Sequence, residues 1–314
     1  MTGPESQEGA PPGWSIAGRR VVITGATGGI GLAAARELAR RGALLTLVAR
    51  SAARGDAAAA AVRAAARDGG EVEVLHADLG VQASVRRLAA EVLARHPRVD
   101  VLVNNAGAIH ASRRLTEDGI ELTWAVNHLA PFLLTALLLE RLVESAPARV
   151  VTTSSDAHRG ARIPFGDLSA ERGVGAAGFR RYGQTKLANI LFTAELARRL
   201  EGTGVTATCF HPGFVASGFN RNNGALMRVG MTLARPFARS PERGAETLVW
   251  LVSSPEAERG SGGYFVDRRR REPSAAARDA EAARRLWELS EAQTHQEVGV
   301  GRGGRATRAG RPGL

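Results

Sequence analysis

Short runs of valine, leucine and isoleucine alternate with longer helix-like segments along most of the chain. Such runs predict strands, and the segments between them predict helices. The strands are predicted at residues 19–25, 44–50, 71–78, 99–107, 148–155 and 205–213. The helices are predicted at residues 31–42, 52–67, 81–95, 118–144 and 180–201. Because the strand runs are apolar on both faces, this alternation indicates an α/β fold with a doubly wound parallel sheet.

Residues 1–15 and 295–314 lack this pattern and are rich in polar residues and glycine, with arginine added at the C-terminal end. Such segments bury little apolar surface, so we expect two disordered tails around one domain at 16–294. The N-terminal tail has no basic or apolar signal region, and the most apolar run, 131–143, is too short to span a bilayer. We therefore expect a buried helix at this run, and a cytoplasmic protein with no membrane partner.

The formal net charge of +11 raises the question of a nucleic-acid partner. Eight of the arginines lie in two short segments, 268–271 and 301–314, without interleaved aromatic residues. Surfaces that bind single-stranded nucleic acid combine basic residues with aromatic stacking platforms. We therefore interpret the tail as a solvated basic segment and expect no nucleic-acid partner. The single cysteine, Cys209, excludes an internal disulfide.

The stretch TGATGGIG, Thr24–Gly31, lies between the first predicted strand and the first predicted helix. Gly25, Gly29 and Gly31 allow a tight turn and a close approach of the main chain to a pyrophosphate. The phosphates would meet free N–H groups at the positive end of the helix dipole. The stretch predicts the nucleotide-binding loop of a Rossmann-type domain, and a tight turn without a ligand is the alternative.

The end of the second predicted strand bears on the choice of nucleotide. NAD-binding enzymes usually place an acidic residue there to bind the ribose 2′-hydroxyl. This chain has Ala49 and Arg50, and the next acidic residue is Asp56. A guanidinium group can bind a 2′-phosphate, which a carboxylate would repel. We therefore predict that NADP(H) is preferred over NAD(H), unless Arg50 is an ordinary surface arginine.

The chain has 42 basic residues and only one lysine among them, Lys186, which follows Tyr182 by four positions. On a helix this spacing places both side chains on one face. A cation about 4 Å from the phenol is worth on the order of 4 kcal/mol at an effective dielectric of about 20. That energy would lower the tyrosine pKa by roughly three units, to about 7, where proton transfer is efficient. The pair predicts an acid–base site that needs no metal ion.

Further motifs follow the glycine stretch in the order of one enzyme family. They are NNAG at Asn104–Gly107, Ser155 at a strand end, YGQTK at 182–186 and HPG at His211–Gly213. Across residues 17–290 the set resembles the short-chain dehydrogenase/reductase family. IPFGDL, TKLANILF and RRLWELSE, which begin at residues 163, 185 and 284, are similar to its retinol dehydrogenase and protochlorophyllide reductase branch. The resemblance implies interconversion of an aldehyde or ketone with an alcohol by hydride transfer, and Arg50 indicates NADP(H) as the cofactor.

The resemblance also implies the catalytic roles. Tyr182 would act as general acid/base, and Lys186 would assist it and bind the nicotinamide ribose. Ser155 would hold the substrate oxygen. The alternative for a serine at a strand end is a turn cap, which fits Ser154 better. Asn127 would position a water of the proton relay, and a mid-helix asparagine costs helix propensity, which favours a functional role.

Cofactor contacts are implied in the same way. Asp78 would bond to the adenine amine, although a turn or helix cap is its alternative role. Asn105 and Gly107 would line the ribose, and Val215 and Ser217 would hold the nicotinamide carboxamide. The complete predicted set is Gly25, Gly29, Ile30, Gly31, Arg50, Asp78, Leu79, Asn105, Gly107, Tyr182, Lys186, Val215 and Ser217.

One departure from the family is the spacing of 27 positions between Ser155 and Tyr182, longer than in most members. The additional loop should border the entrance to the substrate site. It could also obstruct the usual helix-to-helix homodimer, so the sequence does not decide whether the protein is a homodimer. No charged residue is an obvious partner for a charged substrate, which favours an apolar carbonyl compound. A non-catalytic NADP(H)-binding sensor or scaffold is the alternative function. Such proteins commonly lose the tyrosine or the lysine, and both are present here.

Overall fold

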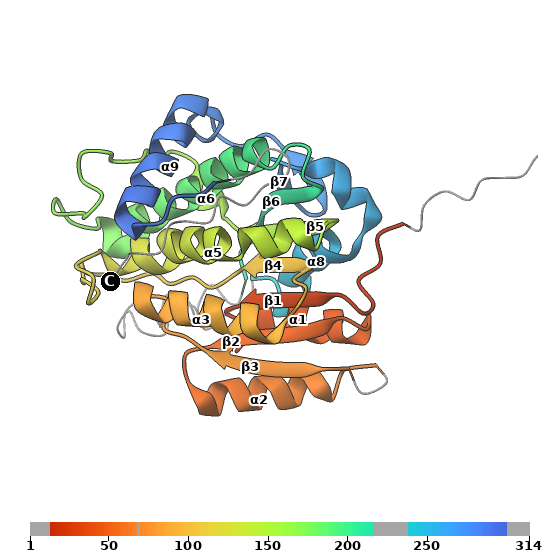
Figure 1. Ribbon diagram of the computed structural model, residues 1–314. Helices are drawn as coiled ribbons and strands as arrows, with labels where there is room; N and C mark the ends of the chain where they lie inside the picture. The colour runs from red at the N-terminus through yellow and green to blue at the C-terminus, as the bar shows by residue number, and fades with distance from the viewer. Residues whose placement is uncertain (1–12, 68–69, 216–237, 300–314) are drawn as a thin grey trace, which may run out of the picture.

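The computed structural model describes residues 13–67, 70–215 and 238–299. One sheet runs in the order β3-β2-β1-β4-β5-β6-β7-β8, with β8 antiparallel to β7 and the other pairs parallel (Figure 1). The order reverses between β1 and β4, as in a doubly wound sheet, so the predicted α/β fold is confirmed. The strands are β1 (Arg20–Thr24), β2 (Leu44–Ala49), β3 (Val72–His76), β4 (Val101–Asn104), β5 (Ala148–Thr153), β6 (Val205–His211), β7 (Tyr264–Val266) and β8 (Arg269–Arg271).

Helices cover both faces of this sheet (Figure 1). One apolar cluster joins α1, α2 and α8 to the sheet and includes Leu38 and Leu248. Another joins α3, α5 and α6 and includes Leu88 and Leu138. Strands β1 and β4 are buried along their whole length, which explains why their sequences do not alternate with polar residues. These helices are α1 (Gly29–Arg40), α2 (Ala52–Arg63), α3 (Gln82–Arg95), α5 (Ala130–Glu144), α6 (Phe179–Arg199) and α8 (Pro241–Ser253).

The helix predicted at 118–144 is assembled from three pieces. It begins with α4 (Leu122–Trp124), continues through a π-helical turn, η1 (Ala125–Leu129), and ends as α5. Among the described residues it alone is long and apolar enough to cross a membrane, with a mean hydropathy of 1.6 over its most apolar window. However, 78% of that window is buried inside the protein. It is a core helix, as predicted.

The domain begins earlier than predicted. Trp14, which composition placed in the N-terminal tail, is buried, and its Nε1 donates a hydrogen bond to the carbonyl oxygen of Val252 at 2.8 Å. The guanidinium groups of Arg19 and Arg149 lie over its ring at 4.0 and 3.9 Å from the centroid. A single aromatic anchor in a glycine- and proline-rich segment creates no periodic pattern, so composition alone missed it.

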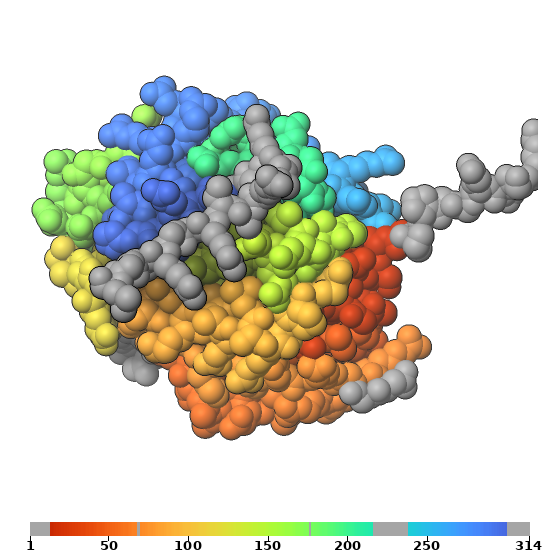
Figure 2. All heavy atoms as spheres, in the orientation of Figure 1, coloured from red at the N-terminus to blue at the C-terminus, as the bar shows by residue number. Residues whose placement is uncertain are grey.

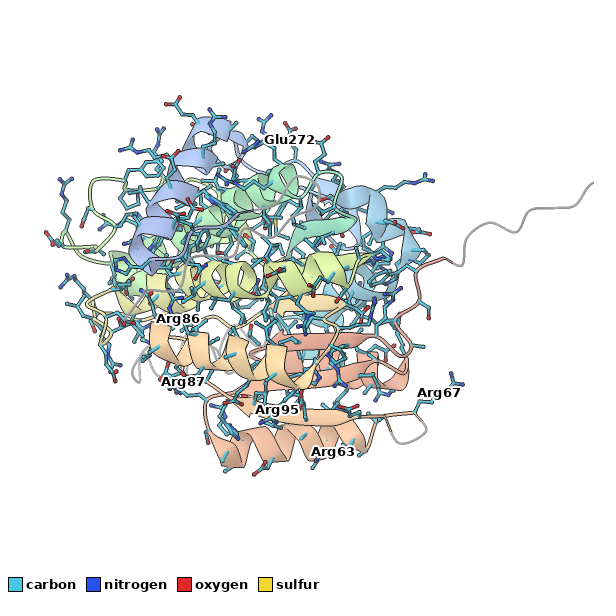
Figure 3. All side chains as sticks on the ribbon, in the orientation of Figure 1. Arg63, Arg67, Arg86, Arg87, Arg95 and Glu272 are labelled. Carbon is cyan, nitrogen blue, oxygen red and sulfur yellow. The ribbon has the colours of Figure 1, made fainter. Side chains whose placement is uncertain are left out.

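The domain also ends later than predicted. Helix α9 (Ala280–Thr294) packs against α6, and the blue C-terminal segment lies on the same face as α3 and α5 (Figure 2). Arg86 on α3 (Figure 3) donates to the carbonyl oxygen of Thr294 at 2.6 Å, and Val298 is buried in the cluster with α3 and α5. The tail boundary at 295 is therefore wrong for residues 295–299, while residues 300–314 lie outside the described part.

Candidate active site

The glycine loop joins β1 to α1 at the carboxyl-terminal edge of the sheet. Gly25 and Gly29 have φ angles of 68° and 52°, a region that favours glycine. A Cβ on Gly25 would lie 2.8 Å from the Cα of Ala106, and one on Gly31 would lie 2.2 Å from the carbonyl oxygen of Gly25. No side chain fits at either position, so the loop packs directly on the end of β4.

The N-terminus of α1 presents main-chain donors to open space. Gly28 precedes the helix, no side chain caps it, and a Cβ on Gly28 would meet nothing within 4 Å. The first N–H groups of a helix lack intrahelical acceptors and carry a partial positive charge. The donor set and the open approach therefore suit the pyrophosphate of a dinucleotide.

Asn105 ties the glycine loop to the neighbouring strands. Its Nδ2 donates to the carbonyl oxygens of Thr24 and Gly25 at 3.1 and 3.2 Å, and its Oδ1 accepts from Thr153 Oγ1 at 3.2 Å. Its main-chain N–H donates to Thr24 Oγ1 at 3.0 Å. Gly107 lies two residues further and is half-buried. Asn105 thus holds the loop, a role that sequence reasoning had not assigned.

Three predicted contacts follow β2 and β3. Arg50 is exposed directly after β2, and because Thr24 pairs with Val48, it lies at the edge that carries the glycine loop. The carboxylate of Asp78 accepts from the main-chain N–H of Gly80 at 2.8 Å. Asp78 therefore makes a turn contact, as its alternative role requires, while its contact with adenine stays a prediction. Leu79 is half-buried against the core.

Tyr182 and Lys186 lie one turn apart on α6, as their spacing predicts. The side chain of Lys186 is buried, and its Nζ donates to the carbonyl oxygen of Thr153 at 3.0 Å. The same Nζ lies over the Tyr182 ring, 5.4 Å from its centroid. Because Thr153 ends β5, this bond fixes the lysine at the carboxyl-terminal edge of the sheet.

The protonation states differ from those predicted. Burial raises the pKa of Tyr182 to about 12, and a hydrogen bond with Ser155 works against that rise. Burial lowers the pKa of Lys186 to about 8. The expectation of a phenol pKa of about 7 is therefore wrong for this structure, because the loss of hydration on burial outweighs the hydrogen bond with Ser155. The phenol is protonated at neutral pH.

The two serines after β5 have distinct roles. Ser155 bonds to Tyr182, and its hydroxyl also accepts from the N–H of Ala157 at 3.2 Å, which caps a 3₁₀ turn, η2 (Asp156–His158). Ser154 is buried and donates to the carbonyl oxygen of Lys186 at 2.8 Å. The expected turn cap is therefore Ser155 rather than Ser154, and Ser154 anchors the helix that carries the lysine.

Asn127 lies in the π-helical turn η1 and is fully buried. Its Oδ1 accepts from the N–H of Ala108 at 2.7 Å, and its Nδ2 donates to the carbonyl oxygen of Ala108 at 2.8 Å. The same Nδ2 donates to Thr185 Oγ1 at 3.1 Å, and that hydroxyl donates to the carbonyl oxygen of Tyr182 at 2.7 Å. Single π turns occur frequently at functional sites. The asparagine thus joins the loop after β4 to the Tyr182 helix.

The predicted nicotinamide contacts are described only in part. Val215 is buried, and a Cβ on Gly244 of α8 would lie 2.6 Å from its Cγ2 and 3.2 Å from Cγ1 of Ile30. Val215 and Ile30 therefore both pack around Gly244, beside the glycine loop. Ser217 lies outside the described residues.

Two buried charged residues beside the site escaped prediction. Glu121 precedes α4 and Arg181 precedes Tyr182, and they form an ion pair of 2.8 Å with both side chains 0% exposed. An acidic residue before an apolar helical run is a signal for an N-cap, but nothing in the sequence indicates its distant partner. The described residues contain no group of three His, Cys, Asp or Glu placed to hold a metal ion.

His128 is structural, as expected. Its Nε2 lies 2.9 Å from Ser290 Oγ, and its ring lies 4.7 Å from that of Trp124 between centroids. Burial lowers its pKa to about 3, so it is neutral at physiological pH. It joins η1 to α9 and does not enter the Tyr182 site.

Known proteins are similar to this chain in sequence. Residues 19–227 match the family described as short chain dehydrogenase. The chain is 46% identical to Retinol dehydrogenase 12 of Mus musculus over 275 residues, 88% of this chain and 86% of that protein. It is 42% identical to a proposed daunorubicin C-13 ketoreductase of Streptomyces sp. (strain C5) over 295 residues, 93% of this chain and 98% of that protein.

A solved structure has the same fold. A short chain dehydrogenase from Burkholderia cenocepacia J2315, in complex with NADP, superposes with a TM-score of 0.64 at 27% sequence identity, covering 84% of this chain and 99% of that one. The protein is accordingly an NAD(P)-dependent oxidoreductase acting on alcohol and carbonyl groups. The chain belongs to the short-chain dehydrogenase family, in its retinol dehydrogenase-like branch.

Proposed function

We propose that the protein is an NADP(H)-dependent carbonyl reductase for apolar aldehydes or ketones, with Tyr182 as the proton donor. The observation that carries this proposal is the meeting of Tyr182, Ser155 and buried Lys186 at the edge where the glycine loop opens. The high pKa of Tyr182 keeps the phenol protonated at neutral pH, which is the form that carbonyl reduction requires.

Each residue would have one task. Ser155 and Tyr182 would donate hydrogen bonds to the substrate oxygen, and Tyr182 would pass its proton to the alkoxide as it forms. The bound nicotinamide supplies the hydride. Lys186, whose pKa of about 8 lies close to neutrality, would return a proton to Tyr182.

Asn127 would keep the loop after β4 and the Tyr182 helix in register. Both ends of its side-chain amide bind the protein, to Ala108 and to Thr185. A direct structural tie therefore supplements the water-positioning role that the resemblance implies.

The choice of NADP(H) rests on Arg50. The residue is exposed at the cofactor edge, and no carboxylate occupies the end of β2. Binding of NADPH and NADH should be measured by fluorescence titration for wild type and Arg50→Asp. We expect wild type to favour NADPH by at least about tenfold, because hydrogen bonds to charged groups contribute about 1.5–3 kcal/mol. Arg50→Asp should erase or reverse that preference.

The matched control is Arg87→Asp, which makes the same charge change at an exposed position on α3 (Figure 3). It should leave the preference unchanged. Equal affinities of wild type for the two nucleotides would refute the assignment to Arg50.

The activity itself is tested with a carbonyl panel followed at the nicotinamide absorbance. The names of the relatives suggest retinol with NADP⁺ and daunorubicin with NADPH as first substrates, followed by smaller apolar aldehydes and ketones. Turnover of apolar compounds is the expected result. Tight NADPH binding without turnover of any member would instead favour a non-catalytic nucleotide-binding protein.

A further inference from the structure

The buried ion pair of Glu121 and Arg181 joins two helical segments that carry the catalytic groups. The Glu121 carboxylate accepts the N–H groups of Thr123 and Trp124 at 2.9 Å each, and it accepts Arg181 Nε at 2.8 Å. It therefore caps the helix that leads to Asn127 and binds the residue next to Tyr182 in the same contact.

Arg181 also holds the long loop between β5 and α6. Its Nη2 donates to the carbonyl oxygen of Leu168, and its Nη1 donates to Gln184 Oε1 at 3.3 Å. Its guanidinium lies over the Trp124 ring, 4.7 Å from the centroid. One side chain thus contacts the loop, the start of α4 and the next turn of its own helix.

A second tie crosses the same junction on the other side of Tyr182. Asn127 Nδ2 donates to Thr185 Oγ1 at 3.1 Å, so the two helical segments are joined before and after the tyrosine. With both ties in place, a shift of α4 relative to α6 would move Asn127 away from Thr185 and change the position of Tyr182. Small misplacements of this kind cost large factors in rate.

A buried ion pair is weak evidence for a stabilising role, because well-packed apolar residues often replace one without loss. A buried ion pair can instead fix the relative position of the two segments that carry it, because each charged group needs its partner in a narrow range of positions. Another acidic residue on α6, Glu195, pairs with Arg198 and Arg199, whose side chains are 57% and 27% exposed. That cluster lies about 20 Å along the helix from Arg181, at 1.5 Å per residue.

We propose that Glu121 and Arg181 are positioning residues that hold the Asn127 turn, the β5–α6 loop and the Tyr182 helix in one arrangement, and that this arrangement sets kcat. The inference rests on the proposed carbonyl reductase activity. Neither residue is expected to contact substrate or cofactor, because both side chains are fully buried.

The test compares Glu121→Gln, Arg181→Met and Arg181→Lys with the control Glu195→Gln. We expect Glu121→Gln and Arg181→Met to lower kcat by about tenfold or more, with a much smaller change in the dissociation constant of NADPH. Arg181→Lys keeps the charge next to Glu121 and should recover part of the lost kcat. Glu195→Gln should change kcat less than twofold, on the order expected of a site remote from the chemistry.

Amide hydrogen exchange provides a readout that does not need turnover. In Glu121→Gln, exchange should rise by about fivefold or more in both 121–129 and 179–189 under conditions where the protein is folded. If wild type reduced no carbonyl compound, the proposed function would fail, and the exchange result alone would decide this inference. If the other variants do not fold, the same measurements are made on Arg181→Lys, which is a milder change.

Three results would overturn the proposal. One is a kcat within twofold of wild type in folded Glu121→Gln and Arg181→Met. Another is faster exchange in one of the two segments without the other, which would show that the pair does not couple them. The third is an equal loss of kcat in Glu195→Gln, because any lost ion pair on α6 would then have the same effect.

Discussion

The two ends of the parallel strands hold their buried charges in different ways. At the amino-terminal edge, the carboxylate of Asp100 accepts from Arg19 at 2.9 Å, from Arg98 at 3.0 Å and from the main-chain N–H of Arg20 at 2.9 Å. At the carboxyl-terminal edge, Lys186 binds a neutral carbonyl oxygen and forms no ion pair within the described ranges. Burial alone lowers its pKa.

The difference separates stability from function. A buried carboxylate that accepts three hydrogen bonds has its polar atoms satisfied within the protein, and such bonds contribute to stability. A buried ammonium group without a carboxylate destabilises the fold, and such perturbed groups gather at functional sites. A cavity of about 850 Å³ lies at the amino-terminal edge, lined by Arg19, Arg20, Glu71 and Glu73 among others, away from Tyr182. Because its charged groups are paired with one another, we assign it no chemistry.

The largest expected effect comes from removing the phenol at the carboxyl-terminal edge. Tyr182→Phe should lower kcat by about a thousandfold, within the range for loss of a general acid, while NADPH still binds. Steady-state kinetics and nucleotide titration measure the two quantities. The other tyrosine, Tyr264, donates to Asp156 at 3.0 Å, and Tyr264→Phe should affect stability rather than turnover. Wild-type turnover in Tyr182→Phe would eliminate the proposed mechanism.

The next effect concerns the stability cost of Lys186. Its pKa falls from 10.5 to about 8 on folding, so the unfolded chain binds the proton more tightly. The cost is fully present below pH 8, decreases as the pH rises toward 10.5, and is absent above it. Lys186→Met should therefore unfold with a free energy up to about 3 kcal/mol higher than wild type at pH 7, while losing activity. Urea denaturation between pH 7 and 10.5 measures this difference, which should shrink with pH. A constant difference would show that titration of Lys186 is not its source.

At the amino-terminal edge, Asp100→Asn should lower stability and leave activity unchanged, the opposite of Lys186→Met. We expect the free energy of unfolding to fall by about 1–3 kcal/mol, because the neutral amide cannot satisfy three donors equally well. The kcat should stay near the wild-type value, because the residue lies at the far end of the strands. Urea denaturation and steady-state kinetics on one preparation test both statements. A large loss of kcat in the folded variant would show that the two edges are coupled.

The smallest effect is expected when the ammonium group of Lys186 is replaced by a guanidinium group. Lys186→Arg keeps a positive charge, but the guanidinium is larger and planar and does not deprotonate at accessible pH. We expect a folded protein with at least about tenfold lower turnover, roughly 1.4 kcal/mol in barrier. Arg98→Lys, at the amino-terminal edge, should leave turnover unchanged. Full activity in Lys186→Arg would mean that charge alone is required at this position.

Sequence patterns located the strands well because burial leaves long apolar runs. The run 44–50, for example, becomes β2 at Leu44–Ala49 with every residue but the first buried. The predicted segments ended at residue 213, however, and the structure adds α8, β7, β8 and α9. Strand β8, Arg269–Arg271, consists of exposed arginines, which no hydrophobic pattern can identify. Its charges suit an edge strand, where they oppose pairing with other chains.

The residues of the candidate site could be predicted from the sequence, but their burial and their long-range contacts could not. The four-residue spacing correctly placed Tyr182 and Lys186 on one helix face. It carried no information about solvation, and so the predicted direction of the Tyr182 pKa shift was wrong. Likewise, no local pattern relates Glu121 to Arg181, because 60 positions separate them and only the packed fold brings them together.

Lys186 is the only lysine of the chain, and it lies at the centre of the site. Nitrogen-15 lysine supplied during expression would therefore label a single side-chain amine in the whole protein, the buried Nζ. Its nuclear resonance would report protonation and nucleotide binding at that atom without overlap from surface amines. The arginine-rich composition thus gives this enzyme a built-in spectroscopic probe of its own active site.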